Sequence, residues 1–172
     1  MQQSVKGMTV LEVMITTVVL GVLLSIAAPA FKHQVQQSQL TAATNQLVTA
    51  IHYARAEALR TGQRVVLCSS ANQTTCQPQA DWHDGWIIFL DPAASGQPDG
   101  QPLRVHRFDN QASISITGNQ PVAQYISYTA DGRAKLLSGA LQMGTLQICG
   151  PTAGRALVLN SGGRVRNNVI DC

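Results

Sequence analysis

The sequence predicts an α+β protein in which one long N-terminal helix packs on an antiparallel, β-sandwich-like head. Three observations predict this fold class. An almost unbroken apolar run lies near the start, a helical apolar pattern continues to Thr61, and eight short β-type runs fill the chain beyond Gly62. The resulting parts are residues 1–7, 8–30, 31–61 and 62–172.

Residues 8–30 are apolar enough and long enough to cross a bilayer. A helix of ~20 residues, rising 1.5 Å per residue, spans the ~30 Å hydrocarbon core. Lys6 precedes this run and all four cysteines follow it, which predicts a cytoplasmic N-terminus and a head in an oxidising compartment. The short polar start does not match an ordinary secretory signal. We therefore expect a single-pass membrane helix.

A carboxylate, Glu12, lies near the start of this apolar run. A charge in lipid costs at least about 2.5 kcal/mol, so an intramembrane acid indicates a function and requires a partner. The alternative is an ordinary anchor whose Glu12 lies at the headgroup boundary, because this residue is only about one helical turn from the start.

The amphipathic continuation, residues 31–61, keeps the helical period, and its apolar stripe is expected to pack on the head. Pro29 is expected to bend the helix near the membrane surface, and Gly62 to end it. The stripe consists of Val35, Leu40, Ala43, Leu47, Ile51, Ala54 and Ala58.

The head contains short runs rich in β-branched and aromatic residues, separated by turn clusters, which predict antiparallel strands. Asp131-Gly132 is typical of a two-residue hairpin turn. No internal repeat divides this region, so it is predicted to be one domain. The runs are residues 64–69, 85–91, 103–108, 113–117, 124–129, 145–149, 156–160 and 164–170.

The composition indicates one modest domain and no enzyme. Of 172 residues only 12% are charged, and the net charge of +3 is too small to require nucleic acid. Motifs for a nucleophile elbow, a zinc protease or a phosphate loop are absent from the sequence. We therefore predict a non-enzymatic protein with no cofactor and no small-molecule substrate.

Two features of the head resemble ligand sites but favour simpler interpretations. Asp91 and Asp99 are acidic turn residues of the kind that bind Ca²⁺, yet Ala93, Ala94 and Pro98 lie between them, which favours an ordinary loop and no metal. Trp82 and Trp86 are suited to stacking on bases or sugars, but aromatic residues beside a strand are more often packed in a core or at its rim.

The four cysteines, Cys68, Cys76, Cys149 and Cys172, allow three pairings. We predict Cys68–Cys76, which closes a short loop after a strand, and Cys149–Cys172, which fastens the last residue to another strand. The second bridge is expected to limit fraying of the C-terminal segment.

Lys6-Gly7 followed by Met8-Thr9-Val10-Leu11-Glu12-Val13 resembles the type III signal of type IV pilins and type II secretion pseudopilins. The resemblance implies that a prepilin peptidase cuts after Gly7 and methylates Met8. Glu12 is then the fifth residue of the mature chain, where it meets the amino group of a neighbouring subunit's first residue. Phenylalanine is more usual than Met8 at this place.

The chain resembles the GspH/FimT family of minor pilins and pseudopilins over nearly its whole length. The positions that match the family are Ala54-Arg55, Glu57-Ala58, Trp82, Gly85-Trp86, Phe89, Asp91, Asp99, Leu103-Arg104 and Gly163-Arg164-Val165-Arg166.

The Gly-Arg-x-Arg segment implies DNA binding, because transformation-linked members of the family bind DNA through it. On a strand, residues two apart share a face, so Arg164 and Arg166 would project together about 7 Å apart. Their guanidinium forks suit phosphate oxygens, and Gly162-Gly163 is expected to let DNA approach closely. Arg155, Arg133 and Lys135 are candidates to extend the patch. The alternative is that both arginines keep an edge strand soluble.

Three functions are compatible with the sequence. The first is a type IV pilus minor pilin of the priming or tip complex, with non-specific DNA binding during natural transformation. The second is a purely structural minor pilin, and the third is a GspH-like minor pseudopilin of a type II secretion system. The expected partners are other pilins, prepilin peptidase, the bacterial inner membrane and DNA phosphates. The expected location is the inner membrane, with the head periplasmic, and then the extracellular pilus.

Overall fold

The computed structural model describes residues 7, 9–107 and 114–172. The chain forms two compact units, residues 1–35 and 36–172. Helix α1 (Val10–Thr61) contributes its first part to the first unit and the remainder to the second. Residue 29 does not end the helix.

The first unit is an apolar helix whose start is capped. The backbone N–H of Glu12 donates to Thr9 Oγ1 at 3.3 Å, so Thr9 and Glu12 stand in the Thr-x-x-Glu order typical of helix N-termini. The large apolar side chains that the structure describes in this segment are exposed, for example Val10 at 79% and Leu23 at 59%. Among the described residues, α1 holds one stretch apolar and long enough to cross a membrane, and none of that stretch is buried in the protein.

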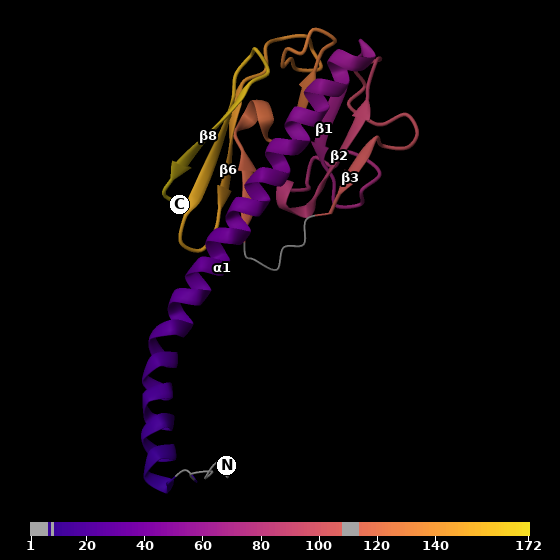
Figure 1. Ribbon diagram of the computed structural model, residues 1–172. Helices are drawn as coiled ribbons and strands as arrows, with labels where there is room; N and C mark the ends of the chain where they lie inside the picture. The colour runs from indigo at the N-terminus through magenta and orange to yellow at the C-terminus, as the bar shows by residue number, and fades with distance from the viewer. Residues whose placement is uncertain (1–6, 8, 108–113) are drawn as a thin grey trace, which may run out of the picture. The chain divides into compact units, whose positions relative to one another are not determined.

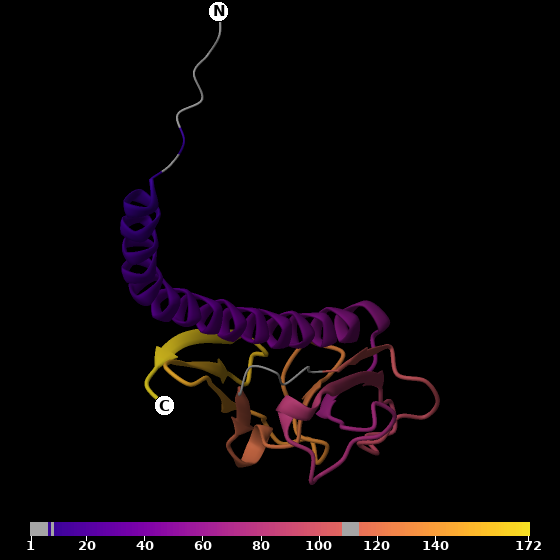
Figure 2. The ribbon, with the colours of Figure 1, turned by 90° about the horizontal axis from the view of Figure 1, so that it is seen from below.

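In the second unit, the helix buries one face on the head (Figure 2). Val35 is 37% exposed, so the buried stripe begins later than the sequence predicted. Gly62 has φ +65° and donates its N–H to Ala58 O at 3.0 Å, which ends the helix with a left-handed cap as expected. The buried stripe is Leu40, Ala43, Leu47, Ala50, Ile51, Ala54 and Ala58.

The head contains two four-stranded antiparallel sheets, which lie along the part of α1 that belongs to the second unit (Figure 1). Each of the eight predicted runs overlaps one strand, and the α+β class is confirmed. The first sheet has the order β3-β2-β1-β5, with β1 (Val65–Ser69), β2 (Trp86–Leu90), β3 (Arg104–His106) and β5 (Tyr125–Tyr128). The second has the order β4-β6-β7-β8, with β4 (Ser115–Gly118), β6 (Gly144–Cys149), β7 (Gly154–Leu159) and β8 (Val165–Ile170).

The two sheets differ in how many faces they bury. Both contribute residues to one core with α1, for example Leu67 from β1 and Leu157 from β7. The first sheet also buries its other face, where Val66, Ile87 and Phe89 form a second cluster. In the second sheet the side chains facing away from α1 include the exposed Gln147. Only the second sheet therefore keeps an open polar face among the described residues.

Two disulfides and two tryptophans secure the head. Cys68 pairs with Cys76, and Cys149 with Cys172, which is the predicted connectivity. Trp82 is 1% exposed and donates its indole N–H to Val122 O at 3.1 Å. Trp86 is 2% exposed, so both tryptophans are core residues, as the simpler interpretation predicted.

Candidate functional site

The assembly candidate, Glu12, lies in the first turn of an exposed apolar helix. Thr9 caps this turn, and Gly7 lies two residues before Thr9 in the sequence. Met8 lies outside the described residues. A carboxylate is favourable at a helix N-terminus because the first N–H groups carry partial positive charge.

The Gly-Arg-x-Arg segment begins in a turn and continues into β8. Gly163 N–H donates to Asn160 O at 2.9 Å, and Asn160 N–H donates to Arg164 O at 3.0 Å. Arg164 N–H also donates to Asn160 Oδ1 at 3.0 Å. Gly163 adopts φ +77°, the left-handed conformation that closes a three-residue hairpin loop.

A second loop of the same type lies against the first. Thr129 N–H donates to Arg133 O at 3.0 Å, and Gly132 has φ +72°. The predicted two-residue turn is therefore a three-residue loop, because Gly132 occupies the left-handed position after the turn. Ala134 N–H donates to Ser161 O at 3.2 Å and joins the two loops.

Arg55 of α1 clasps both loops. Its Nε donates to Gly132 O and its Nη2 to Gly162 O, each at 3.0 Å. Tyr128 donates its hydroxyl to Gly163 O at 3.3 Å, and burial raises the pKa of Tyr128, so it stays protonated. Sequence reasoning identified Arg55 only as a family position. Arg55 directly follows Ala54 of the predicted apolar stripe, and this position beside the buried face was the signal in the sequence for a contact between Arg55 and the head.

Gly163 is buried, which corrects its predicted role. A Cβ at this position would collide with Gly132 O and would lie 2.8 Å from Tyr128 Cε1 and 3.1 Å from Arg55 Nε. The space that a side chain would fill is occupied by the protein itself. Gly163 therefore shapes the loop and is not a surface that DNA can approach.

Arg164 and Arg166 are both exposed. Arg166 lies opposite Val158 in the β7–β8 ladder, and the Asn160 to Arg164 hydrogen bond continues the same ladder by one more pair. Because residues two apart on one strand share a face, both side chains lie on the side of the second sheet that faces away from α1.

The three residues predicted to extend this patch lie on three different elements. Arg155 pairs with Ile148 and Val169, so strand alternation places it on the sheet face opposite Arg166, and it cannot extend the patch there. Arg133 directly follows the neighbouring loop, and its Nε lies 3.5 Å from Asp131 Oδ2. Lys135 follows β5, and its N–H donates to Ser127 O in the first sheet.

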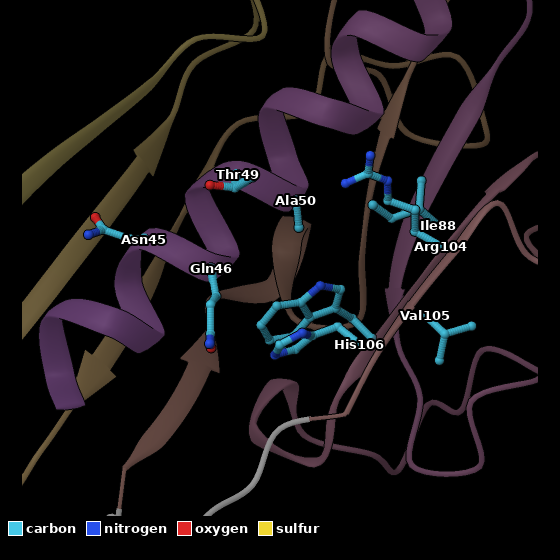
Figure 3. Close-up of a pocket in the computed structure, with 9 residues that line it drawn as sticks. Asn45, Gln46, Thr49, Ala50, Ile88, Arg104, Val105 and His106 are labelled. Carbon is cyan, nitrogen blue, oxygen red and sulfur yellow. The ribbon is translucent and has the colours of Figure 1, made fainter.

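A pocket of about 350 Å³ lies between α1 and strands β2 and β3 (Figure 3). Arg104 stacks over Tyr53, 3.9 Å from the ring centre. His106 stacks on Trp86 at 4.2 Å, and burial lowers the pKa of His106, so its imidazole is neutral at pH 7. The lining residues include no carboxylate or thiol; they are Asn45, Gln46, Thr49, Ala50, Trp86, Ile88, Arg104, Val105 and His106.

The acidic loop after β2 is held by its own backbone. The buried Asp91 carboxylate accepts from Ser95 N–H and Gly96 N–H, both at 2.8 Å, whereas Asp99 is exposed. Asp91 therefore organises the loop. In the described part of the chain, no three His, Cys, Asp or Glu residues lie together in a way that suits a metal ion.

Comparisons with known proteins bear on both the family and the fold. The sequence model of the family described as "Type II transport protein GspH" matches residues 43–163. No curated protein sequence matches the chain significantly.

Two crystal forms of the type IV minor pilin FimU from Pseudomonas aeruginosa strain PAO1 have a similar fold. The P21 form has a TM-score of 0.61 at 23% identity, covering 77% of this chain and 90% of FimU. The P65 form has a TM-score of 0.57 at 23% identity, covering 75% and 92%. The family match spans more than half of the chain, and the family's members are structural subunits. The chain therefore belongs to the GspH family of pilins and pseudopilins, and it is not an enzyme.

Proposed function

We propose that this protein is a minor pilin of a type IV pilus, where it takes part in the priming or tip complex. The observation that carries this proposal is the exposed apolar segment of α1 with Glu12 in its first turn, on a chain whose head belongs to the GspH family. In this proposal residues 1–7 are a leader, 8–30 the membrane helix, 31–61 its amphipathic continuation and 62–172 the periplasmic head.

Processing and assembly follow from the chemistry of the N-terminus. Prepilin peptidase cuts between Gly7 and Met8 and methylates the new terminus. The carboxylate of Glu12 then pairs with the amino group of a neighbouring pilin's first residue. Each of these charges is costly in an apolar filament core when alone, and pairing offsets that cost.

Mass spectrometry of membrane-extracted protein tests the processing step. We expect a chain that begins at N-methylated Met8 in a strain with active peptidase. Protein that still carries residues 1–7 in that strain would overturn the pilin proposal.

A Glu12→Leu variant tests the assembly role. We expect normal membrane insertion but loss of incorporation into sheared pili, because the apolar anchor is kept and the acid is removed. Thr17→Val in the same helix is the matched control and should still be incorporated. Equal incorporation of Glu12→Leu and the parent would contradict the pairing.

The second part of the proposal is that the head binds duplex DNA weakly through Arg164 and Arg166 during natural transformation. Both side chains are exposed on one side of the second sheet, and guanidinium forks match phosphate oxygens. With about two to four ionic contacts, log K should fall with log salt at a slope of about −2 to −4. We expect a single head to bind DNA with micromolar or weaker affinity, so useful capture requires several subunits at the tip.

The full chain in a non-ionic detergent and a mixed-sequence DNA duplex test this part. The double variant Arg164→Gln, Arg166→Gln should lose affinity and flatten the salt slope by about 2. A control double variant, Lys32→Gln with Arg107→Gln, removes the same charge elsewhere and should bind nearly as the parent does. Parent-like binding by the first variant would exclude this site, and no binding by the parent would leave a purely structural minor pilin.

A minor pseudopilin of a type II secretion system is the second candidate function. The matching family, "Type II transport protein GspH", favours it. The two disulfides and the Gly-Arg-x-Arg ending favour the pilus, because they resemble the FimT-type members of the family. A deletion strain distinguishes the two: loss of twitching and transformation indicates the pilus, and loss of protein secretion indicates the pseudopilus.

A further inference from the structure

The charges of this chain are unevenly distributed along its sequence. Residues 133–170 contain five of the twelve Lys and Arg residues and none of the nine Asp and Glu residues. The net positive charge of the protein therefore comes from this stretch, which includes three strands of the second sheet, β6, β7 and β8. Of these five, Arg164 and Arg166 lie on the side of the second sheet that faces away from α1, where they would attract a polyanion.

The second sheet has one face free to receive such a partner. Its inner face packs on α1 through Leu146, Ile148, Leu157 and Leu159. The outer face is the one that carries Arg166. In the first sheet, by contrast, the corresponding face is covered by a second apolar cluster.

The strand register lines up polar side chains across this outer face. Asn168 of β8 lies opposite Ala156, Ala156 opposite Gln147, and Gln147 opposite Thr117 of β4. Directly opposed residues of antiparallel strands share a face, so this row crosses all four strands. Its polar members, Asn168, Gln147 and Thr117, are all exposed.

A second row lies beside the first. Arg166 is opposite Val158, and Val158 is opposite Thr145. Neighbouring strands are about 4.8 Å apart, so the two rows cover a platform about 14 Å wide. Amide and hydroxyl groups donate hydrogen bonds to phosphate oxygens and position a duplex without reading its sequence.

We propose that duplex DNA lies across this outer face, so that its backbone runs from Arg164 and Arg166 at the β8 edge over Asn168 and Gln147 toward Thr117 on β4. This inference rests on the proposed DNA binding and extends that site from one edge strand to the whole sheet. The arginines supply the ionic contacts, and the neutral row supplies additional hydrogen bonds and the direction of the bound duplex.

Charge substitutions at Gln147 test the path, because this residue lies two strands away from the arginines. The probe is a duplex of about 20 base pairs, titrated into the full chain in detergent between about 50 and 200 mM salt. Gln147→Lys should tighten binding about fivefold at the low-salt end and steepen the salt slope by about 0.9, one additional phosphate contact. Gln147→Glu should weaken binding about fivefold through like-charge repulsion.

Gln46→Lys and Gln46→Glu are the matched controls. Gln46 is exposed on α1, which covers the inner faces of the sheets, so these variants change the net charge equally without touching the outer face. They should change affinity by less than about twofold. Tryptophan fluorescence, reporting on the buried Trp82 and Trp86, verifies the fold of each variant.

The outcomes separate this inference from the proposal beneath it. If Gln147 variants respond as expected and Gln46 variants do not, the path across the sheet is supported. If the parent binds and the Arg164→Gln, Arg166→Gln variant does not, yet Gln147 and Gln46 variants behave alike, the path is wrong and the arginine site stands. If the parent does not bind DNA at low salt, both are overturned.

Discussion

Gly163→Ala is the substitution whose effect the structure determines most directly. Gly163 has φ +77°, a conformation that costs an L-residue about 1 kcal/mol. The added Cβ would also collide with Gly132 O and would lie 2.8 Å from Tyr128 Cε1. Overpacking of this kind costs about 1–3 kcal/mol. We expect the free energy of unfolding to fall by about 2–4 kcal/mol in total.

Substitutions at two other glycines separate the cost of the left-handed backbone conformation from the cost of the steric collision. Gly100 has φ +96° but open space around its Cβ position, so Gly100→Ala should cost only the backbone term of about 1 kcal/mol. Gly162 lies outside the left-handed region, and its Cβ would meet only Asn160, at 3.3 Å. Gly162→Ala should therefore change stability by less than about 0.5 kcal/mol.

Urea unfolding followed by tryptophan fluorescence measures all three variants, because both tryptophans of the chain are buried in the head. From most to least stable, we expect the order Gly162→Ala, Gly100→Ala and Gly163→Ala. If Gly163→Ala is as stable as Gly162→Ala, then Gly132 O and Tyr128 do not pack closely against Gly163, and the reasoning is wrong.

Three further predictions concern the clasp, the C-terminus and pH. Arg55→Gln should lower the free energy of unfolding by about 2–3 kcal/mol, because the charged donors to the carbonyls of Gly132 and Gly162 are lost, and amide exchange of both loops should rise. Cys172→Ser should lower stability by about 2–5 kcal/mol and should speed exchange in β8, whereas parent-like exchange would show that Cys149–Cys172 does not restrain this strand. Burial lowers the pKa of His106 below its usual 6.5. The unfolded chain therefore takes up this proton first, so the free energy of unfolding does not depend on His106 above pH 6.5 and declines as pH falls below it. His106→Gln should flatten this decline between pH 7.5 and 5.5, measured by urea unfolding, and an unchanged slope would contradict the prediction.

Local patterns in the sequence were sufficient to predict most secondary structure. The eight strand-like runs each overlap a strand, and Gly62 ends the helix, because alternation, helical period and turn residues act over a few neighbouring positions. The apolar run and its acid, Glu12, could likewise be identified from composition and order. Val35 was misassigned because an isolated apolar residue at the right spacing need not have a packing partner.

Only the tertiary structure showed how the Gly-Arg-x-Arg segment packs and which face its side chains occupy. Arg55 bonds to carbonyls 77 and 107 residues away in sequence, so no local pattern could reveal that it clasps the loop or that Gly163 is buried beneath it. Strand register, also a long-range property, places Arg155 on the face opposite Arg166. The sequence by itself determined the elements and the chemical types of the candidate residues, since these depend on short-range order. Which side chains share a surface depended on how distant segments pack, and only the folded chain could specify it.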